Sequence, residues 1–274
     1  MNKKKKVIIL GGDGRQRLLY DMLKDDGYEV VHIENSNDYE EKIKGADVLV
    51  FPVPVSKDKV NVFSDNPDYK LNLVKVLDSI SKDVVVFGGG FSGEIKEFFE
   101  REEIEYHDML LSELFTVENA YLTVQGALRL LFENAQESLL NKKVLVTGYG
   151  RISVFLSDAL KKLAMKVYVL ARNDIQLKAA ELSGMETLRL SESPEFGDFD
   201  FIFNTVPNVI FDRKSVGTMK KSAMYFELAS APFGAKKEDF SPDGCSYILA
   251  SSLPGRYLPV SSAKLIKNYI EQFL

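Results

Sequence analysis

The sequence VLVTGYGRIS at residues 144–153 decides the fold of this 274-residue chain. An apolar run leads into Gly148 and Gly150, and residues 153–163 then have helical spacing. The first glycine permits a tight turn, the second lets a ligand approach the backbone, and Ser153 is small enough for close packing of helix on strand. We therefore expect a strand, a turn and a helix, the repeating unit of a parallel α/β sheet.

The spacing of these small residues matches the dinucleotide-binding fingerprint G-x-G-x-x-G/A. The pyrophosphate of such a cofactor lies on the amide groups of the following helix. A second strand expected at 166–170 follows at the right distance, which makes the match informative. We expect a dinucleotide site, and its candidate contacts at this turn are Gly148, Tyr149, Gly150, Arg151 and Ile152.

The end of the second strand bears on the choice of cofactor. An NAD site has Asp or Glu there, about 20 residues after the motif, to bind the ribose 2′-hydroxyl. This chain instead has Ala171, Arg172 and Asn173. Because an arginine pairs with phosphate through charge-assisted hydrogen bonds, Arg172 favours NADP over NAD. Asp174 would be the acidic residue that binds the ribose 2′-hydroxyl if the strand ends one turn later than expected.

Three later loops follow predicted strands, and open α/β sheets bind ligands at the carboxyl ends of their strands. The loops are 204–208, 228–232 and 251–257. Their candidate cofactor contacts are Asn204, Thr205, Val206, Pro207, Ala229 and Leu253.

Strand and helix patterns alternate along the whole chain, which predicts parallel β-α-β units. A long helix at 116–136 separates two such series, and another helix ends the chain. We expect two Rossmann-like parallel-sheet α/β domains separated by a cleft and joined by the long helix. The predicted parts are a flavodoxin-like substrate domain (1–115, to which the C-terminal helix at 258–274 returns), the linking helix (116–136) and an NAD(P)-binding domain (137–257).

Composition excludes several classes of protein. The chain has one Cys and two His, too few for a four-ligand zinc site, so no metal centre is expected. A net charge of −5 without a basic stripe argues against nucleic-acid binding, and no apolar run is long enough to span a membrane. A second glycine loop, at 11–14, precedes Arg15 and Gln16, where a cofactor helix needs a small residue. We interpret it as a substrate-domain loop.

Several segments together resemble the family of dipicolinate synthase A subunits. They follow in order over nearly the whole chain and are 11–16, 116–119, 123–127, 148–151, 204–207, 227–230 and 253–255. Two positions depart from the family pattern. Ser153 stands where relatives tend to have Gly, and Gln125 stands where the family has Glu. The segment 116–119 could be a shifted copy that supplies Glu118 instead, so both alignments stay open.

The resemblance implies an NAD(P)-binding subunit that oxidises dihydrodipicolinate, or a related dicarboxylate, to dipicolinate during sporulation. It implies a flavoprotein-like B subunit of dipicolinate synthase as partner and the mother-cell cytoplasm as location. Analogy with dehydrogenases of this shape suggests that two copies of the chain form a homodimer. Arg15 and Arg256, from the two predicted halves, are candidates to clamp the two carboxylates. Candidate proton acceptors are Asp13, whose pKa burial would have to raise, Glu118 and a water on Ser252. Hydrogen bonds to the substrate are assigned to Gln16, Asn119, Thr123 and Gln125.

Two other functions fit the same sequence. One is a different NADP-dependent dehydrogenase of this architecture, acting on an amino or hydroxy acid. The other is a non-catalytic nucleotide-binding subunit that regulates a flavoprotein partner, because no histidine is placed as an obvious acid or base.

Overall fold

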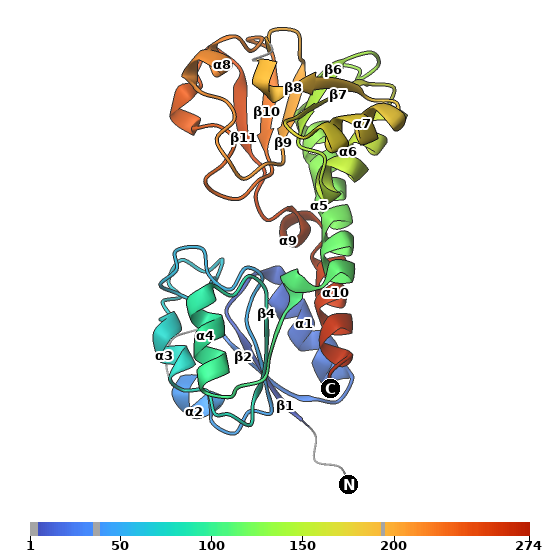
Figure 1. The fold of residues 1–274 in the computed structure, drawn as a ribbon. Helices are drawn as coiled ribbons and strands as arrows, with labels where there is room; N and C mark the ends of the chain where they lie inside the picture. The colour runs from blue at the N-terminus through green and yellow to red at the C-terminus, as the bar shows by residue number, and fades with distance from the viewer. Residues whose placement is uncertain (1–4, 35–38, 193–194) are drawn as a thin grey trace. The chain divides into compact units, whose positions relative to one another are not determined.

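The computed structural model describes residues 5–34, 39–192 and 195–274 (Figure 1). Contacts within the chain divide it into two compact units. The first unit comprises Met1–Asn119 and Pro254–Leu274, and the second comprises Ala120–Leu253. Each unit contains one parallel β-sheet whose strands alternate with helices along the chain. The two parallel-sheet α/β domains expected from the sequence are therefore confirmed.

The first unit has the strand order β2-β1-β3-β4-β5. These strands are β1 (Lys6–Leu10), β2 (Glu29–Ile33), β3 (Val48–Val50), β4 (Val85–Gly88) and β5 (Tyr106–Asp108). The helices are α1 (Gly14–Asp25), α2 (Tyr39–Ile43), α3 (Leu73–Leu77), α4 (Gly93–Arg101) and the C-terminal α10 (Pro259–Glu271). Helix α10 packs against α1, so the end of the chain returns to the first unit (Figure 1).

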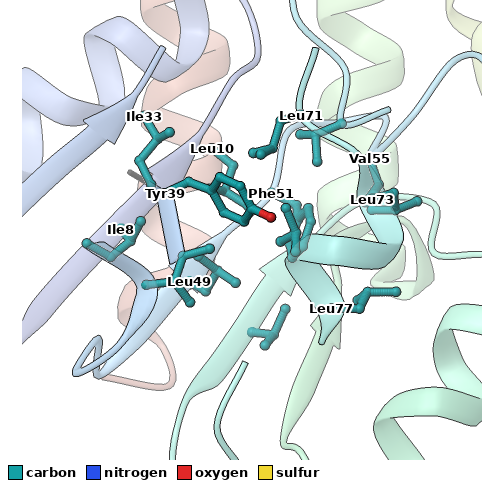
Figure 2. Packing of buried hydrophobic residues seen from close by; sticks show 14 of the residues in the cluster. Ile8, Leu10, Ile33, Tyr39, Leu49, Phe51, Val55, Leu71, Leu73 and Leu77 are labelled. Carbon is teal, nitrogen blue, oxygen red and sulfur yellow. The ribbon is translucent and has the colours of Figure 1, made fainter. Parts of the chain in front are cut away.

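The core of this unit holds β1 in place. Residues 7–10 are completely buried, as expected for a central strand of a parallel sheet covered on both faces. Figure 2 shows the apolar cluster on one face, with Ile8, Leu10, Ile33, Tyr39, Leu49, Phe51, Val55, Leu71, Leu73 and Leu77 labelled. The strand order reverses between β1 and β3, which makes the loop after β1 a topological switch point where such sheets bind ligands.

Helix α5 (Glu113–Asn134) follows a short 3₁₀ turn, η1 (Met109–Leu111). The sequence predicts this helix at 116–136, so it begins earlier than expected. Ser112 explains the difference, because its hydroxyl accepts a hydrogen bond from the Phe115 amide over 3.3 Å and caps the first turn. The helix starts in the first unit and ends in the second.

The second unit has the strand order β11-β10-β9-β6-β7-β8, with every pair parallel. Its strands are β6 (Lys143–Thr147), β7 (Lys166–Ala171), β8 (Glu186–Arg189), β9 (Phe201–Asn204), β10 (Met224–Glu227) and β11 (Ser246–Leu249). Its helices are α6 (Arg151–Lys162), α7 (Asp174–Leu182) and α8 (Arg213–Gly217), with 3₁₀ turns η2 (Leu190–Glu192) and η3 (Lys237–Asp239). This is the Rossmann order, whose switch point lies between β6 and β9. Helix α9 (Leu253–Tyr257) begins at the last residue of this unit and continues into the first.

The apolar pattern of the sequence does not predict strands β5 and β8. Both are short edge strands that contain charged residues, so neither forms the apolar run that marks a buried strand. Within the described ranges, we find no helix with the length and apolar character that crossing a membrane requires.

Candidate functional site

The turn between β6 and α6 lies at the switch point of the second unit. Gly148 has φ +73°, and a Cβ on it would lie 2.8 Å from Cγ2 of Val206, so glycine is required there. Gly150 is the N-cap of α6, and a Cβ on it would meet no heavy atom of the described residues within 4 Å, its chain neighbours aside. As a glycine, this N-cap has no side chain that could accept hydrogen bonds from the first-turn amides. The first-turn amides of a helix have no partner within the helix, and an anionic pyrophosphate is a ligand that fits this position.

A group of hydroxyls ties this turn to the end of β9. Ser153, at the third fingerprint position, is completely buried, and its Oγ lies 2.7 Å from Thr205 Oγ1. Thr205 Oγ1 donates to the Thr147 carbonyl over 2.7 Å. The serine that departs from the family pattern therefore fits beside the strand and adds a hydrogen bond between α6 and the β9 loop.

Asn204 links the end of β9 to both neighbouring strands. Its Oδ1 accepts a hydrogen bond from Thr147 Oγ1 over 2.6 Å, and its Nδ2 donates to the Val206 carbonyl over 3.0 Å. The same Nδ2 donates to Glu227 Oε1 over 2.5 Å. Asn204 is completely buried, and its hydrogen bonds tie the end of β9 to β6 and β10.

Glu227 ends β10 and is also completely buried. Besides Asn204, its carboxylate accepts hydrogen bonds from the Ala229 amide (3.1 Å), the Tyr225 hydroxyl (2.9 Å) and the Gly234 amide (2.8 Å). Burial raises the pKa of Glu227 above its ordinary value, although the hydrogen-bond donors act in the opposite direction. The sequence pattern alone assigned no role to Thr147, Tyr225 or Glu227. The sequence feature that could have drawn attention to Glu227 is an acidic residue at the end of an apolar strand, followed by small residues.

Strand β7 ends one residue later than the predicted range 166–170. The strand stops at Ala171, which is buried, and Arg172 follows it as an exposed residue. Asn173 caps α7 by accepting a hydrogen bond from the Ile175 amide over 2.8 Å. Asp174, the alternative acid, is the first residue of α7 and forms an ion pair with Arg189.

The remaining candidate cofactor contacts differ in exposure. Arg151 and Pro207 are exposed, whereas Tyr149, Ile152, Thr205 and Val206 are half-buried. Ala229 and Leu253 are buried, and Leu253 packs against Gly126 of α5, where a Cβ would lie 2.8 Å from that of Leu253.

The glycine loop after β1 forms the equivalent turn in the first unit. Gly11 and Gly12 have φ values of +43° and +87°. Asp13 is the N-cap of α1, and Gln16 Oε1 accepts a hydrogen bond from the Asp13 amide over 3.0 Å, which completes a capping box. Gln16 is completely buried, and its Nε2 has no hydrogen-bond partner among the described residues, so its hydrogen bond to a substrate stays a prediction.

Arg15 forms a two-point ion pair with Asp13. Its Nε and Nη2 donate to the two carboxylate oxygens over 2.8 Å each, and Nη2 also donates to the Val53 carbonyl over 2.7 Å. Arg15 is 5% exposed and Asp13 is 9% exposed. A Cβ on Gly255 of α9 would lie 2.7 Å from Asp13 Oδ2, so α9 covers this pair.

This pairing corrects the expectation that burial raises the pKa of Asp13 for a role as base. Burial acts to raise the pKa of Asp13, but the Arg15 guanidinium outweighs it and lowers that pKa below its ordinary value. The raised pKa that a base role for Asp13 needs is therefore missing.

The position of Arg256 corrects the expectation that Arg15 and Arg256 come from different halves of the chain. Arg256 belongs to the first unit, as Arg15 does. It is exposed, and its guanidinium lies 4.8 Å from the centre of the Tyr257 ring.

The candidates on α5 lie on different faces of the helix. Glu118 and Gln125 are exposed and seven positions apart, which places them on one face. Asn119 is half-buried and Thr123 is buried. Ser252 is half-buried with φ +55°. Within the predicted catalytic set, the structure joins Asp13 by hydrogen bonds to both Arg15 and Gln16.

Comparison with known proteins matches a large part of the first unit to a described domain family. Residues 6–110 match the N-terminal domain of the dipicolinate synthase A subunit. The chain is 21% identical to the dipicolinate synthase A subunit of Bacillus subtilis (strain 168) over 98% of this chain and 95% of that protein. The resemblance seen in the sequence is thus confirmed.

Solved structures show the same fold. The crystal structure of the dipicolinate synthase A subunit from Bacillus halodurans has a TM-score of 0.82 at 19% identity, covering 98% of this chain and 97% of that chain. A transhydrogenase from Sinorhizobium meliloti has a TM-score of 0.67 at 13% identity, covering 98% and 92% of the two chains. At these identities the likeness establishes a dehydrogenase-like fold.

Proposed function

We propose that the chain is the NADP-binding A subunit of a dipicolinate synthase, which oxidises dihydrodipicolinate to dipicolinate. The observation that carries this proposal is the open glycine turn at the switch point of the second unit, in a chain that resembles the A subunit of dipicolinate synthase over 98% of its length. A bound nicotinamide would supply the hydride acceptor for the oxidation.

The residues of the second unit would bind and orient the dinucleotide. The amides at the start of α6 would hold the pyrophosphate, with Gly150 allowing its approach. Arg172 would pair with a 2′-phosphate at the end of β7. The loops after β9 and β10, with Thr205 and Ala229, would lie along the other half of the cofactor, because the two halves bind on either side of the switch point.

The residues of the first unit would recognise the dicarboxylate. Arg256 is exposed and available to a carboxylate, whereas Arg15 is engaged by Asp13. A substrate carboxylate that approaches Arg15 must therefore share the guanidinium with Asp13. Glu118 and a water on Ser252 remain the proposed proton acceptors, and aromatisation of the product ring lowers the demand for a strong base.

A fluorescence titration with NADPH and NADH, followed by an assay of NADP⁺ reduction with dihydrodipicolinate, tests the proposal. We expect tight NADPH binding and substrate-dependent reduction, and no binding of either dinucleotide would reject it. Reduction with pyruvate or alanine instead of dihydrodipicolinate would indicate an amino- or hydroxy-acid dehydrogenase.

A non-catalytic nucleotide-binding subunit is the second candidate function. The observation that favours it is the Asp13–Arg15 pair, which leaves Asp13 a weak base. The same assay with and without the flavoprotein-like B subunit separates the two functions. If the chain binds NADPH but reduces no NADP⁺ on its own, the second function is favoured.

A further inference from the structure

We propose that Glu227 is a positioning residue, which orders the ends of β9 and β10 before a dinucleotide binds. This inference rests on the proposed dinucleotide site in the second unit. It concerns a carboxylate that is completely buried and therefore has no exposed surface of its own.

The hydrogen bonds of Glu227 reach three parts of the unit. Glu227 accepts one hydrogen bond from the side chain of Asn204 at the end of β9. It accepts another from the hydroxyl of Tyr225, which lies on β10 with Glu227 itself. The other two come from the amides of Ala229 and Gly234, which fold the loop after β10 around the carboxylate. Each oxygen thus accepts two donors, so the ionised form of the carboxylate satisfies all of them.

The connection continues from Asn204 toward the cofactor turn. Asn204 Oδ1 accepts from Thr147 Oγ1, which in turn accepts from the Thr205 amide over 3.1 Å. Thr205 then contacts Ser153 of α6. A continuous set of buried and partly buried hydrogen bonds therefore runs from β10 through β9 to β6 and α6. A loop that is already ordered before binding loses less conformational entropy when the cofactor binds.

The substitution Glu227→Gln separates this role from general stability. Glutamine keeps the shape, but it offers one acceptor and one NH₂ donor in place of two acceptors, so one pair of donors loses its partner. The adenosine half of the cofactor would bind at the β6–β7 side, away from β10 in the strand order. We therefore compare NADP⁺ with adenosine 2′,5′-bisphosphate as probes.

We expect E227Q to raise the Kd for NADP⁺ at least about tenfold and to change the Kd for the adenosine fragment less than about threefold. The matched control is D108N. Asp108 is another buried carboxylate that accepts backbone amides, from Gly90, Phe91 and Leu110, but it lies in the first unit. D108N should leave both Kd values unchanged.

Equal loss of both probes in E227Q, or loss of neither, overturns the positioning role while the proposed function stands. Failure of the wild-type protein to bind either probe overturns both. Hydrogen exchange of the wild-type protein gives a second test that needs no variant. We expect the amides of Ala229 and Gly234 to be protected without nucleotide, and protection that arises only after NADP⁺ is added contradicts the inference.

Discussion

The hydroxyl of Ser153 lies 2.7 Å from that of Thr205, which joins the first turn of α6 to the loop after β9. Both ends of this contact belong to the proposed cofactor site, and the serine is completely buried. The third fingerprint position thus contributes a side-chain hydrogen bond in this chain, which a glycine there could not make.

Removal of that hydroxyl should lower stability. We expect S153A to reduce the free energy of unfolding by about 1 kcal/mol, the usual value of one buried hydrogen bond. The matched control is S157A on the same helix, because Ser157 Oγ is buried without a hydrogen-bond partner among the described residues. S157A should be neutral or slightly stabilising in urea unfolding. Equal losses in both variants would show that the Ser153 contact contributes nothing specific.

The Asp13–Arg15 pair should contribute far more to stability than an exposed ion pair. We expect R15A to lower the free energy of unfolding by about 3 kcal/mol, because it leaves a buried carboxylate without its cation. Arg17, on the same helix, pairs with Asp65 over 2.7 Å at the surface, so R17A should cost about 1 kcal/mol or less. Urea unfolding of both variants tests the contrast, and similar losses contradict it.

The lowered pKa of Asp13 predicts a specific acid sensitivity. A carboxyl whose pKa is lower in the folded state stabilises the fold above its unfolded pKa of about 3.8, and this stability is lost as the pH falls through the folded pKa. The difference in unfolding free energy between wild type and D13N should therefore shrink as the pH falls below about 4. A difference that stays constant or grows toward acid would mean that Arg15 does not lower the pKa.

Arg172 should select between the two nicotinamide dinucleotides. We expect R172A to raise the Kd for NADPH about tenfold and to leave that for NADH unchanged, because only NADPH carries the 2′-phosphate. The control is K178A on α7, since Lys178 is exposed and pairs with Glu181. Fluorescence titration measures both affinities. Equal effects of R172A on NADPH and NADH would reject the NADP preference.

The sequence predicted the two sheets and the cofactor turn because their signals are local. Residues 144–153 contain an apolar strand, two glycines and a helix start in one continuous run. The Asp13–Arg15 pair could not be predicted from the sequence. Asp13 caps α1, and contacts with Val53 and Gly255, which are distant in sequence, hold the Arg15 side chain beside it. The Glu227 hydrogen bonds likewise join residues that are distant in sequence, and only the register of β9 on β10 brings Asn204 beside Glu227.

The titration of G150V with NADPH tests the central claim most directly. A Cβ at Gly150 meets no described atom within 4 Å and φ is −94°, so the fold should accept valine while the side chain fills the space that the pyrophosphate needs. Gly217 on α8 has equally open surroundings, so G217V is the matched control. We predict that G150V keeps its unfolding free energy within about 1 kcal/mol and binds NADPH at least about tenfold more weakly, with G217V binding as wild type. Unchanged NADPH affinity in folded G150V would contradict a dinucleotide site at this turn.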